Sequence, residues 1–306
     1  MKTLARKARA VRALAPGDLS AVVAIDAGLG GRARRAYFER RLQAAQRFPE
    51  QHLQLAVEED GSLAGFMLGR ALEGEFGRSE PALRLEALGV KAAAQGRGLG
   101  AGLSEAFEAA ARRRGLPEIR TAAAWREHEL LRFLDRAGYG LAPVHVMDRR
   151  VEPGYEPQAR DELEVRVFSE KDLDGAARVD RRLTGRDRRG YLCRSFAEAL
   201  ADSALRVSLA ACVDGAVAGF LMARLDYGDF GRVEPVAVID TVGVDPLRAR
   251  QGIGRGLLSQ LFVNLDALGV ERVETVVAAG SLDLMGFFCR AGFRPSERLS
   301  FLKRLS

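Results

Sequence analysis

The chain has 306 residues, of which 47% are hydrophobic and 29% are charged, and its formal net charge is +6. This composition is typical of a water-soluble globular protein, and no apolar run reaches the roughly 18 to 20 residues that a membrane-spanning helix needs, so we expect no membrane partner. At roughly 150 residues per domain, the length predicts two domains. The basic start, MKTLARKARAVRALAPGD, has no apolar segment and cleavage site after it, so we predict a cytoplasmic protein rather than a secreted one.

Residues that could bind a metal are scarce. The three cysteines, Cys193, Cys212 and Cys289, have no close spacing, and the chain has three histidines. This pattern argues against a disulfide framework and a structural zinc site, so we expect no metal. Most of the positive charge is arginine, whose planar group suits phosphates and carboxylates. Two explanations stay open: arginines spread over solvated faces by composition bias, or attraction for a polyanionic partner.

The chain repeats itself at an offset of 154 residues, without a gap from Val11 and Val165 to the end. AGFMLGRALEGEFGRSEPALRLEALGV (residues 64–90) aligns with AGFLMARLDYGDFGRVEPVAVIDTVGV (residues 218–244). A repeat of this length is a whole domain rather than a short solenoid module. We predict two similar domains, residues 1–153 and 154–306, joined in VEPGYEPQARDELE (residues 151–164), where prolines and charges replace periodic apolar residues.

In chain order, each copy reads as a strand, helices, a run of strands, a helix, a strand, a helix and a final strand. In the second copy the first strand lies near Val165, and a helix begins near Ser169. Three strands follow between residues 205 and 244, with Asp214 and Gly215 as a hairpin turn. The pattern predicts an α/β (α+β) fold.

A glycine-rich turn comes next and opens a helix in which isoleucine and leucine recur at helical spacing between residues 253 and 268. A short strand, RVETVVA (residues 272–278), follows that helix. Two neighbouring strands joined through one helix form a βαβ unit, in which the strands are parallel. The first copy repeats this order.

The two glycine-rich turns read QGRGLG (residues 95–100) and ARQGIG (residues 249–254), each between a predicted strand and a predicted helix. Backbone N–H groups at the start of a helix lack partners and lie at the positive end of the helix dipole, and glycine lets an anion approach them. One such turn can be merely tight, but its recurrence favours an anion site. No lysine follows a glycine, which excludes a P-loop, and the position after a late strand argues against a dinucleotide fingerprint.

VGVDPLRARQGIGRGLL (residues 242–258) resembles the acetyl-CoA signature of the GNAT acetyltransferase superfamily, and LGVKAAAQGRGLGAGL (residues 88–103) resembles it too. Gln95, Gly98 and Gly100 meet the family pattern in full, whereas Ala249 replaces its first residue in the second copy. The resemblance covers both halves. It implies two tandem GNAT-like domains, each a mixed, mostly antiparallel sheet with a splayed pair of parallel strands and flanking helices.

The resemblance also implies where acetyl-CoA binds as a co-substrate. The pantetheine arm is expected between the splayed strands, against the backbone of Leu88, Gly89, Val90, Val242, Gly243 and Val244. The pyrophosphate is expected on the glycine-rich turns, at Gln95, Gly96, Arg97, Gly98, Leu99, Gly100, Ala101, Arg250, Gln251, Gly252, Ile253, Gly254 and Arg255.

Acetyl transfer to an amine needs a base for the nucleophile and a proton for the leaving thiolate. Strand alternation predicts that Asp240 shares a face with Val236, Val238, Val242 and Val244, and Glu86 takes the matching place in the first copy. Either carboxylate is a candidate base, or it pairs structurally with an arginine or a loop.

Many family members carry a tyrosine in the late helix as the general acid, where this chain has Leu134 and Phe288. Neither can donate a proton, so solvent or another group acts, or one copy does not catalyse. The segments GEFGRSEP (residues 74–81) and GDFGRVEP (residues 228–235) could contact the acceptor, join the domains or be structural loops. The same choice applies to Arg32, Arg34, Arg35 and Tyr37 and to their counterparts Arg186, Arg188, Arg189 and Tyr191.

The residues and the resemblance together predict an acetyl-CoA-dependent N-acetyltransferase with a protein or small-molecule amine as acceptor. The second half is favoured as the better catalyst, because IDTVGVDP resembles active members more closely. The alternative is an acyl-CoA-binding sensory or scaffold protein in which one or both domains do not catalyse. A nucleic-acid partner is not expected, since the chain has no recognised DNA- or RNA-binding module.

Overall fold

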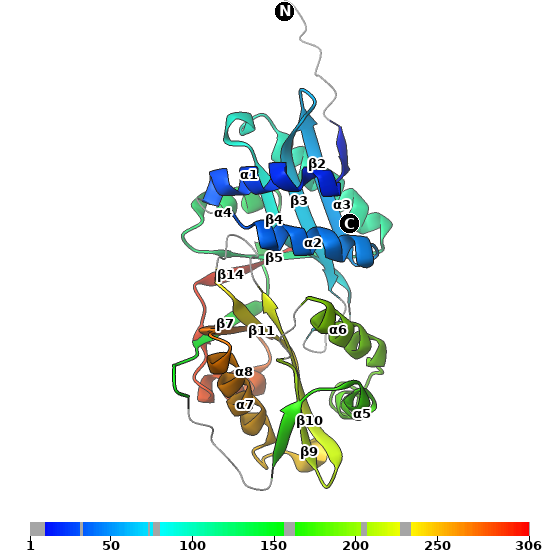
Figure 1. Cartoon of the computed structure of the whole chain (residues 1–306), viewed down its shortest axis with the longest axis vertical. Coiled ribbons are helices and arrows are strands. Elements are labelled where there is room, and N and C mark those ends of the chain that lie inside the picture. The colour runs from blue at the N-terminus through cyan, green and yellow to red at the C-terminus, as the bar shows by residue number, and fades with distance from the viewer. Residues whose placement is uncertain are drawn as a thin grey trace, which may run out of the picture.

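A computed structural model describes residues 10–30, 33–72, 74–75, 80–155, 163–202, 207–226 and 234–305. It consists of two similar units that lie one above the other in Figure 1, each built around a seven-stranded sheet. This architecture confirms the expected α/β fold with two tandem GNAT-like sheets.

The first unit has strands and helices in the predicted order. Its strands are β1 (Val11–Ala13), β2 (His52–Glu59), β3 (Ser62–Leu72), β4 (Ala82–Val90), β5 (Glu118–Ala124) and β6 (Gly140–Leu141). Its helices are α1 (Leu19–Gly30), α2 (Arg35–Arg47), α3 (Leu99–Arg113) and α4 (His128–Arg136), with short 3-10 turns at Pro16–Asp18 and Ala92–Ala94.

The second unit repeats that order. Its strands are β8 (Glu164–Val167), β9 (Leu209–Val213), β10 (Ala216–Asp226), β11 (Val236–Val244), β12 (Arg272–Ala278) and β13 (Arg294–Pro295). Its helices are α5 (Leu173–Thr184), α6 (Arg189–Asp202), α7 (Ile253–Ala267) and α8 (Leu282–Arg290), with 3-10 turns at Glu170–Asp172 and Pro246–Arg248.

Local signals in the sequence explain several of these boundaries. The backbone N–H of Ser169 donates to the carboxylate of Asp172 at 2.8 Å, which caps the turn before α5 at the predicted position. Asp214 and Gly215 have φ angles of 53° and 74° and form the predicted hairpin turn between β9 and β10.

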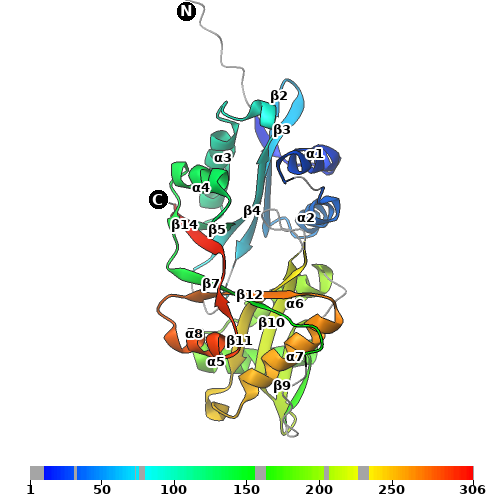
Figure 2. The same ribbon diagram turned by 90° about the vertical axis from the view of Figure 1, so that its left-hand side faces the viewer.

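Helices cover both faces of each sheet. In the first unit α1 and α2 lie on one side of β4, and α3 and α4 lie on the other (Figure 2). Separate apolar cores fill the two interfaces, one centred on Phe38 and Phe66 and the other on Leu103 and Phe107. Each unit therefore has the buried surface of an ordinary domain.

The two units exchange one strand. β14 (Arg298–Arg304), from the end of the chain, pairs with β5 in the first sheet, and β7 (Val144–Arg150) pairs with β12 in the second sheet. Figure 2 shows β14, in red, within the upper unit, while β7 lies beside β12 in the lower one. The boundary between residues 153 and 154 remains a prediction about the repeat, whereas each folded unit contains a strand from the other half.

The parallel strand pairs separate as expected. β4 and β5 pair only at Leu83 with Ile119 and at Arg84 with Arg120, although β4 continues to Val90. In the second unit the pairing of β11 with β12 stops at Ile239 and Thr275, while β11 continues to Val244. Next to each glycine-rich turn, the end of β4 or β11 therefore pairs only with the antiparallel strand on its other side, β3 or β10.

Candidate functional site

The glycine-rich turns hold the starts of α3 and α7. Gly98 and Gly252 precede these helices with φ angles of 84° and 79°, in the left-handed region that favours glycine. The backbone N–H groups that follow, of residues 99–101 and 253–255, have no partner within their helix. The structure thus places the predicted anion-binding amides at two helix starts.

The turn of the second unit carries an unusual backbone. Arg250 has a φ angle of 64°, whereas its counterpart in the first unit is a glycine, Gly96, with a φ angle of 73°. A residue other than glycine in this conformation costs on the order of 1–3 kcal/mol. The second unit tolerates this cost at a residue that lines a large groove.

That groove has a volume of about 1160 Å³ and lies between α7, α8 and β7. It includes the predicted residues Val244, Arg250, Gly252, Ile253, Gly254 and Arg255. Six arginines and two acids, Asp148 and Glu152, line it, which leaves an excess of four positive charges. The arginines are Arg149, Arg150, Arg250, Arg255, Arg290 and Arg294.

The first unit has a different charge at the matching positions. Arg250, Arg255 and Arg294 correspond to Gly96, Ala101 and Gly140. Only Arg136, Lys303 and Arg304 are basic there, and two glutamates, Glu105 and Glu108, replace Ser259 and Phe262. The two glycine-rich turns thus share a backbone but differ strongly in the charge around them.

The exchanged strands complete these surfaces. Arg149 of β7 donates to the carbonyl of Ala291 at 2.5 Å and lies 4.1 Å from the ring centroid of Phe262. In the first unit Lys303 of β14 donates to the carbonyl of Ala137 at 2.7 Å and to Glu108 at 2.6 Å. At the C-terminal ends of α4 and α8, a basic residue from the other half of the chain therefore donates a hydrogen bond to a backbone carbonyl.

The predicted signature residue Gln95 lies within its own turn, where its side chain donates to the carbonyl of Val90 at 3.2 Å. Arg97 forms an exposed ion pair with Glu59, with Nη1 and Oε2 3.2 Å apart. Both side chains thus make contacts within the first unit. The counterpart of Gln95, Ala249, lines the groove of the second unit.

Both candidate carboxylates occupy a bulge, which corrects the expected alternation. Leu221 and Met222 pair with Val242 and Thr241, but Ala223 pairs with Ile239, so Asp240 is an extra residue in β11. Glu86 is the extra residue of β4 in the same way. The bulge reverses the alternation, so Val242 and Val244 pack in the core that contains Ile239. The five residues that were predicted to share one face of the strand therefore do not share it.

The environments of the two carboxylates differ. Glu86 lies 3.3 Å from Nη2 of Arg41 and 3.6 Å from Nε of Arg70, and only 2% of its side chain is exposed. Asp240 lies 3.1 Å from Nε of Arg224, and 16% of its side chain is exposed. Both carboxylates therefore pair with arginine, but only Asp240 reaches solvent.

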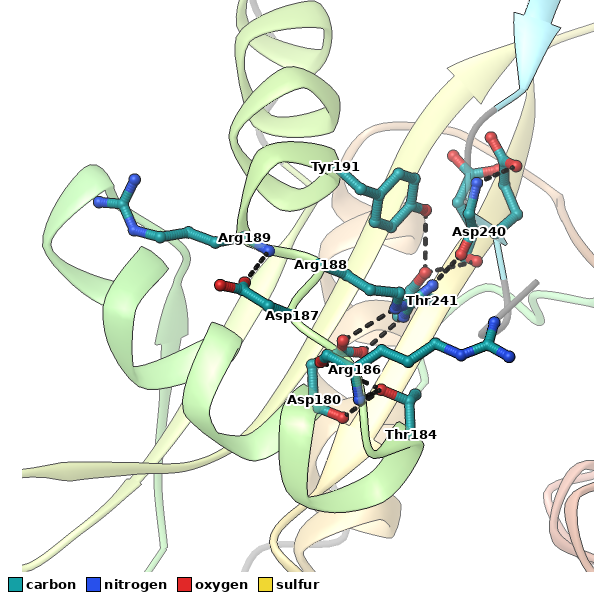
Figure 3. Close-up of polar contacts among 11 residues, drawn as sticks. Asp180, Thr184, Arg186, Asp187, Arg188, Arg189, Tyr191, Asp240 and Thr241 are labelled. Carbon is teal, nitrogen blue, oxygen red and sulfur yellow. Dashed lines mark hydrogen bonds and ion pairs between the residues drawn. The ribbon is translucent and has the colours of Figure 1, made fainter. Parts of the chain in front are cut away.

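The arginines between the early helices form a repeated pair. Arg34 donates to Asp26 at 2.9 Å, and Arg188 donates to Asp180 at 2.8 Å. Figure 3 shows the second pair at the turn before α6. Each ion pair joins the first helix of its unit to the turn that leads into the second helix. Arg34 and Arg188 therefore have a structural role that does not depend on an acceptor. Arg32 lies outside the described residues.

Arg188 also joins the two units, because its Nη1 donates to the carbonyl of Gly74. Glu75 follows, and it lines a small cavity of about 30 Å³ with Asp240, Arg224 and Ser195. The start of GEFGRSEP therefore contacts the second unit, which agrees with the predicted alternative that this segment joins the domains. Residues 76–79 and 228–233, which make up most of the two repeated segments, lie outside the described residues.

Tyr191 of α6 lies beside the bulge, with its hydroxyl 2.9 Å from Oγ1 of Thr241 (Figure 3). Burial, followed by the charges of Glu75 and Asp240, raises the pKa of Tyr191 well above its ordinary value. The hydroxyl therefore stays protonated at neutral pH. Phe288 and Leu134, where many family members have tyrosine, are fully buried in the two cores.

Within the described residues, no helix is long and apolar enough to cross a membrane, and no group of three or more His, Cys, Asp or Glu residues could hold a metal ion. Sequence reasoning missed the ion-pair partners of the carboxylates, Arg41, Arg70 and Arg224, and the cavity residue Ser195. Their pairing depends on contacts between elements, and the only signal in the sequence was that Arg70 and Arg224 match in the repeat.

The model of the acetyltransferase (GNAT) family matches residues 26–139 and again residues 177–293. Two curated proteins, the mycothiol acetyltransferases of Clavibacter michiganensis subsp. michiganensis (strain NCPPB 382) and of Clavibacter sepedonicus, are each 36% identical over 110 residues. These 110 residues are 36% of this chain and 33% and 34% of the two relatives. The match thus spans about a third of the length of the curated relatives.

Solved structures resemble the whole chain. A GCN5-related N-acetyltransferase from Sphaerobacter thermophilus has a TM-score of 0.63 at 19% identity and covers 97% of this chain and 96% of its own. A tandem GNAT protein from the clavulanic acid biosynthesis pathway has a TM-score of 0.67 at 16% identity and covers 98% of this chain and 99% of its own. At these identities the likeness shows the fold alone.

Proposed function

This chain belongs to the acetyltransferase (GNAT) family, and we propose that it transfers an acetyl group from acetyl-CoA to an amine acceptor in its second unit. The observation that carries the proposal is the arginine-lined groove at the start of α7, which lies beside the end of β11 where its pairing with β12 has stopped. A CoA nucleotide is a polyanion, and unpaired helix N–H groups together with arginine are suited to its phosphates.

In this proposal the pantetheine arm lies along Val242, Gly243 and Val244, and the pyrophosphate lies on the amides of residues 250–255. The equivalent residues of the first unit, 88–90 and 95–101, form a weaker donor site, because fewer cations surround its turn. No metal takes part, and the reaction takes place in the cytoplasm.

The chemistry is a direct attack. The nitrogen of the amine forms a bond to the carbonyl carbon of the thioester, the carbon–sulfur bond breaks, and CoA leaves as a thiolate. The amine gives up its proton to Asp240 through a water molecule. The thiolate takes a proton from solvent, because Phe288 and Leu134 cannot supply one.

The acceptor is proposed only as an amine, since the named relatives match a third of their length. The test is release of thiol from acetyl-CoA with a panel of amino sugars, polyamines, amino acids and peptide N-termini. Calorimetry with acetyl-CoA is run beside it. We expect turnover of at least one amine, and binding that weakens as salt rises.

The alternative function is an acyl-CoA-binding sensory or scaffold protein, and the two buried residues at the family's tyrosine position favour it. Binding of acetyl-CoA without turnover of any amine would support that reading. Loss of binding in the double variant Arg250→Gln, Arg255→Gln would locate the donor site in either case. Undiminished binding in that variant would contradict the proposed donor site.

A further inference from the structure

One position differs between the units directly beside the bulge carboxylate. In the first unit Arg41 of α2 approaches Glu86 from the helix side, and Arg70 of β3 approaches it from the neighbouring strand, at 3.3 and 3.6 Å. The counterpart of Arg70 is kept in the second unit as Arg224, but the counterpart of Arg41 is Ser195. The exchange of arginine for serine removes one guanidinium from the carboxylate.

The short side chain leaves space. Ser195 and Asp240 line the same cavity of about 30 Å³, together with Ser208 and Arg224. A water molecule needs roughly 10–15 Å³ of such volume and at least two polar partners, so the cavity has room for water. The side chain of Glu86, by contrast, is 2% exposed between its two arginines.

The charges around Asp240 come from every element that packs against it. Arg224 of β10 is its ion-pair partner and also lies 3.7 Å from the carboxylate of Asp226. Tyr191 of α6 lies close by, and Arg70 and Glu75 of the first unit line the cavity. Arg70 is already paired with Glu86. Asp240 therefore has one strong cationic partner and a neighbouring carboxylate, whereas Glu86 has two cations.

These surroundings decide whether a carboxylate can accept a proton. Two guanidinium groups lie within ion-pair distance of Glu86 and leave only 2% of its side chain exposed to water. A carboxylate with one guanidinium, beside a cavity that has room for water, has a route by which a proton can reach it. The difference between the two carboxylate sites therefore comes from Arg41 in the first unit and Ser195 in the second, rather than from the change of glutamate to aspartate.

We propose that the residue at position 41 or 195 decides which repeat carboxylate can act as the general base: Arg41 disables Glu86, and Ser195 keeps Asp240 available. Ser195 is thus a positioning residue of the second unit, which acts by leaving room for water beside Asp240. The proposal rests on acetyl transfer in the second unit and names the cause of the inequality between the units.

The test transplants the arginine. Ser195→Arg introduces into the second unit the residue that stands beside Glu86 in the first. We expect kcat to fall by about 10²- to 10⁴-fold, the range of a general base, while the dissociation constant of acetyl-CoA changes less than threefold. Leu200→Arg adds the same charge at a position of α6 that is 42% exposed, and we expect it to keep the parent kcat. Ser195→Ala adds no cation and should be at least tenfold more active than Ser195→Arg.

A second readout does not depend on the acceptor. Carbon-13 NMR of protein labelled in Asp and Glu carboxyl groups follows the titration of Asp240 and Glu86 in the full chain. We expect the pKa of Asp240 to fall in Ser195→Arg and the pKa of Glu86 to rise in Arg41→Ser. If Ser195→Arg does not fold, Arg41→Ser decides, and an unchanged pKa of Glu86 overturns the proposal.

The failure of this inference can be told apart from failure of the proposed function. If no amine is acetylated, the function is wrong, and the titrations still report whether Arg41 and Ser195 control the carboxylates. If Asp240→Asn stops turnover while folded Ser195→Arg retains the parent kcat, the second unit is the enzyme and the inference about residue 195 is wrong.

Discussion

At the scale of single residues, the repeat places a carboxylate at the same position of both units, but in two different surroundings. Glu86 is buried between Arg41 and Arg70, and the side chain of Asp240, beside Arg224, is 16% exposed. A buried carboxylate that forms ion pairs with two guanidinium groups serves stability, whereas an accessible one can serve chemistry. The two residues should therefore respond differently to the same substitution.

We expect Asp240→Asn to lower kcat by about 10²- to 10⁴-fold, with little change in the dissociation constant of acetyl-CoA, because the amide keeps the shape but accepts no proton. Steady-state kinetics from pH 6 to 9 and calorimetry provide the measurement. Glu86→Gln is the matched control, and we expect it to retain turnover but to lose about 3–5 kcal/mol of stability. Parent turnover in Asp240→Asn across that pH range would show that its carboxylate is structural.

A second residue-scale prediction concerns acid stability. Burial raises the pKa of Asp172, but hydrogen bonds from Arg166 and Ser169 together lower it by more than burial raises it. The net pKa of Asp172 therefore lies below the ordinary value of 3.8. A lowered folded pKa stabilises the protein above the unfolded value, and this contribution is lost as the pH falls through the folded pKa. The free energy of unfolding should therefore decrease below pH 3.8, in the window set by Asp172.

Asp172→Asn should remove this contribution. We expect lower stability at pH 7 and a shallower loss of stability below pH 4, measured by urea unfolding at a series of pH values. Asp174→Asn in the first turn of α5, where 79% of the aspartate side chain is exposed, is the control and should leave both quantities nearly unchanged. Identical pH profiles for Asp172→Asn and the parent would contradict the linkage.

At the scale of elements, the turn before α7 combines a left-handed glycine with unpaired helix N–H groups. Valine at Gly252 strains the backbone, whose φ angle is 79°, by roughly 1–2 kcal/mol and crowds the amides. We expect Gly252→Val to weaken acetyl-CoA binding at least tenfold in calorimetry. The matched variant Gly98→Val should have the smaller effect on the total binding. Undiminished binding in the double variant Gly98→Val, Gly252→Val would reject the glycine-rich turns as the donor site.

At the scale of the whole molecule, the exchanged strands make the two halves of the chain depend on one another. β14 lies between β5 and β6 in the first sheet, and Lys303 binds the end of α4 and Glu108. Asp226 at the end of β10 adds a contact, since its carboxylate lies 4.0 Å from Arg84 of β4. Removal of the C-terminal strand should therefore destabilise the first unit, which contains the N-terminal half of the chain.

We expect a chain that ends at Glu297, and so lacks β14, to lose hydrogen-exchange protection mainly in the first unit, in β5 and α4. The physical reason is that β5 loses its antiparallel partner along its whole length. Hydrogen exchange followed by mass spectrometry locates the loss. Truncation damage confined to β11 and β12 of the second unit would contradict the exchange of strands.

The sequence by itself determined the repeat, the α/β fold and the position of both glycine-rich turns. These features depend on local signals: φ angles that favour glycine, helical spacing of leucine, and a parallel strand pair that follows from one helix between two strands. Residues such as Gly98 and Gly252 carry that information without reference to distant contacts.

Only the tertiary structure decided the exchange of strands, the bulges and the partners of the carboxylates. Residues 144–150 and 298–304 occupy equivalent places in the repeat, so the alignment is the same whether each strand returns to its own sheet or crosses to the other. A bulge at Asp240 shifts the alternation by one residue, and no local pattern marks it. Whether Glu86 meets Arg41 depends on how α2 packs against β4, because an ion pair between residues far apart in the chain exists only once the core between them has formed.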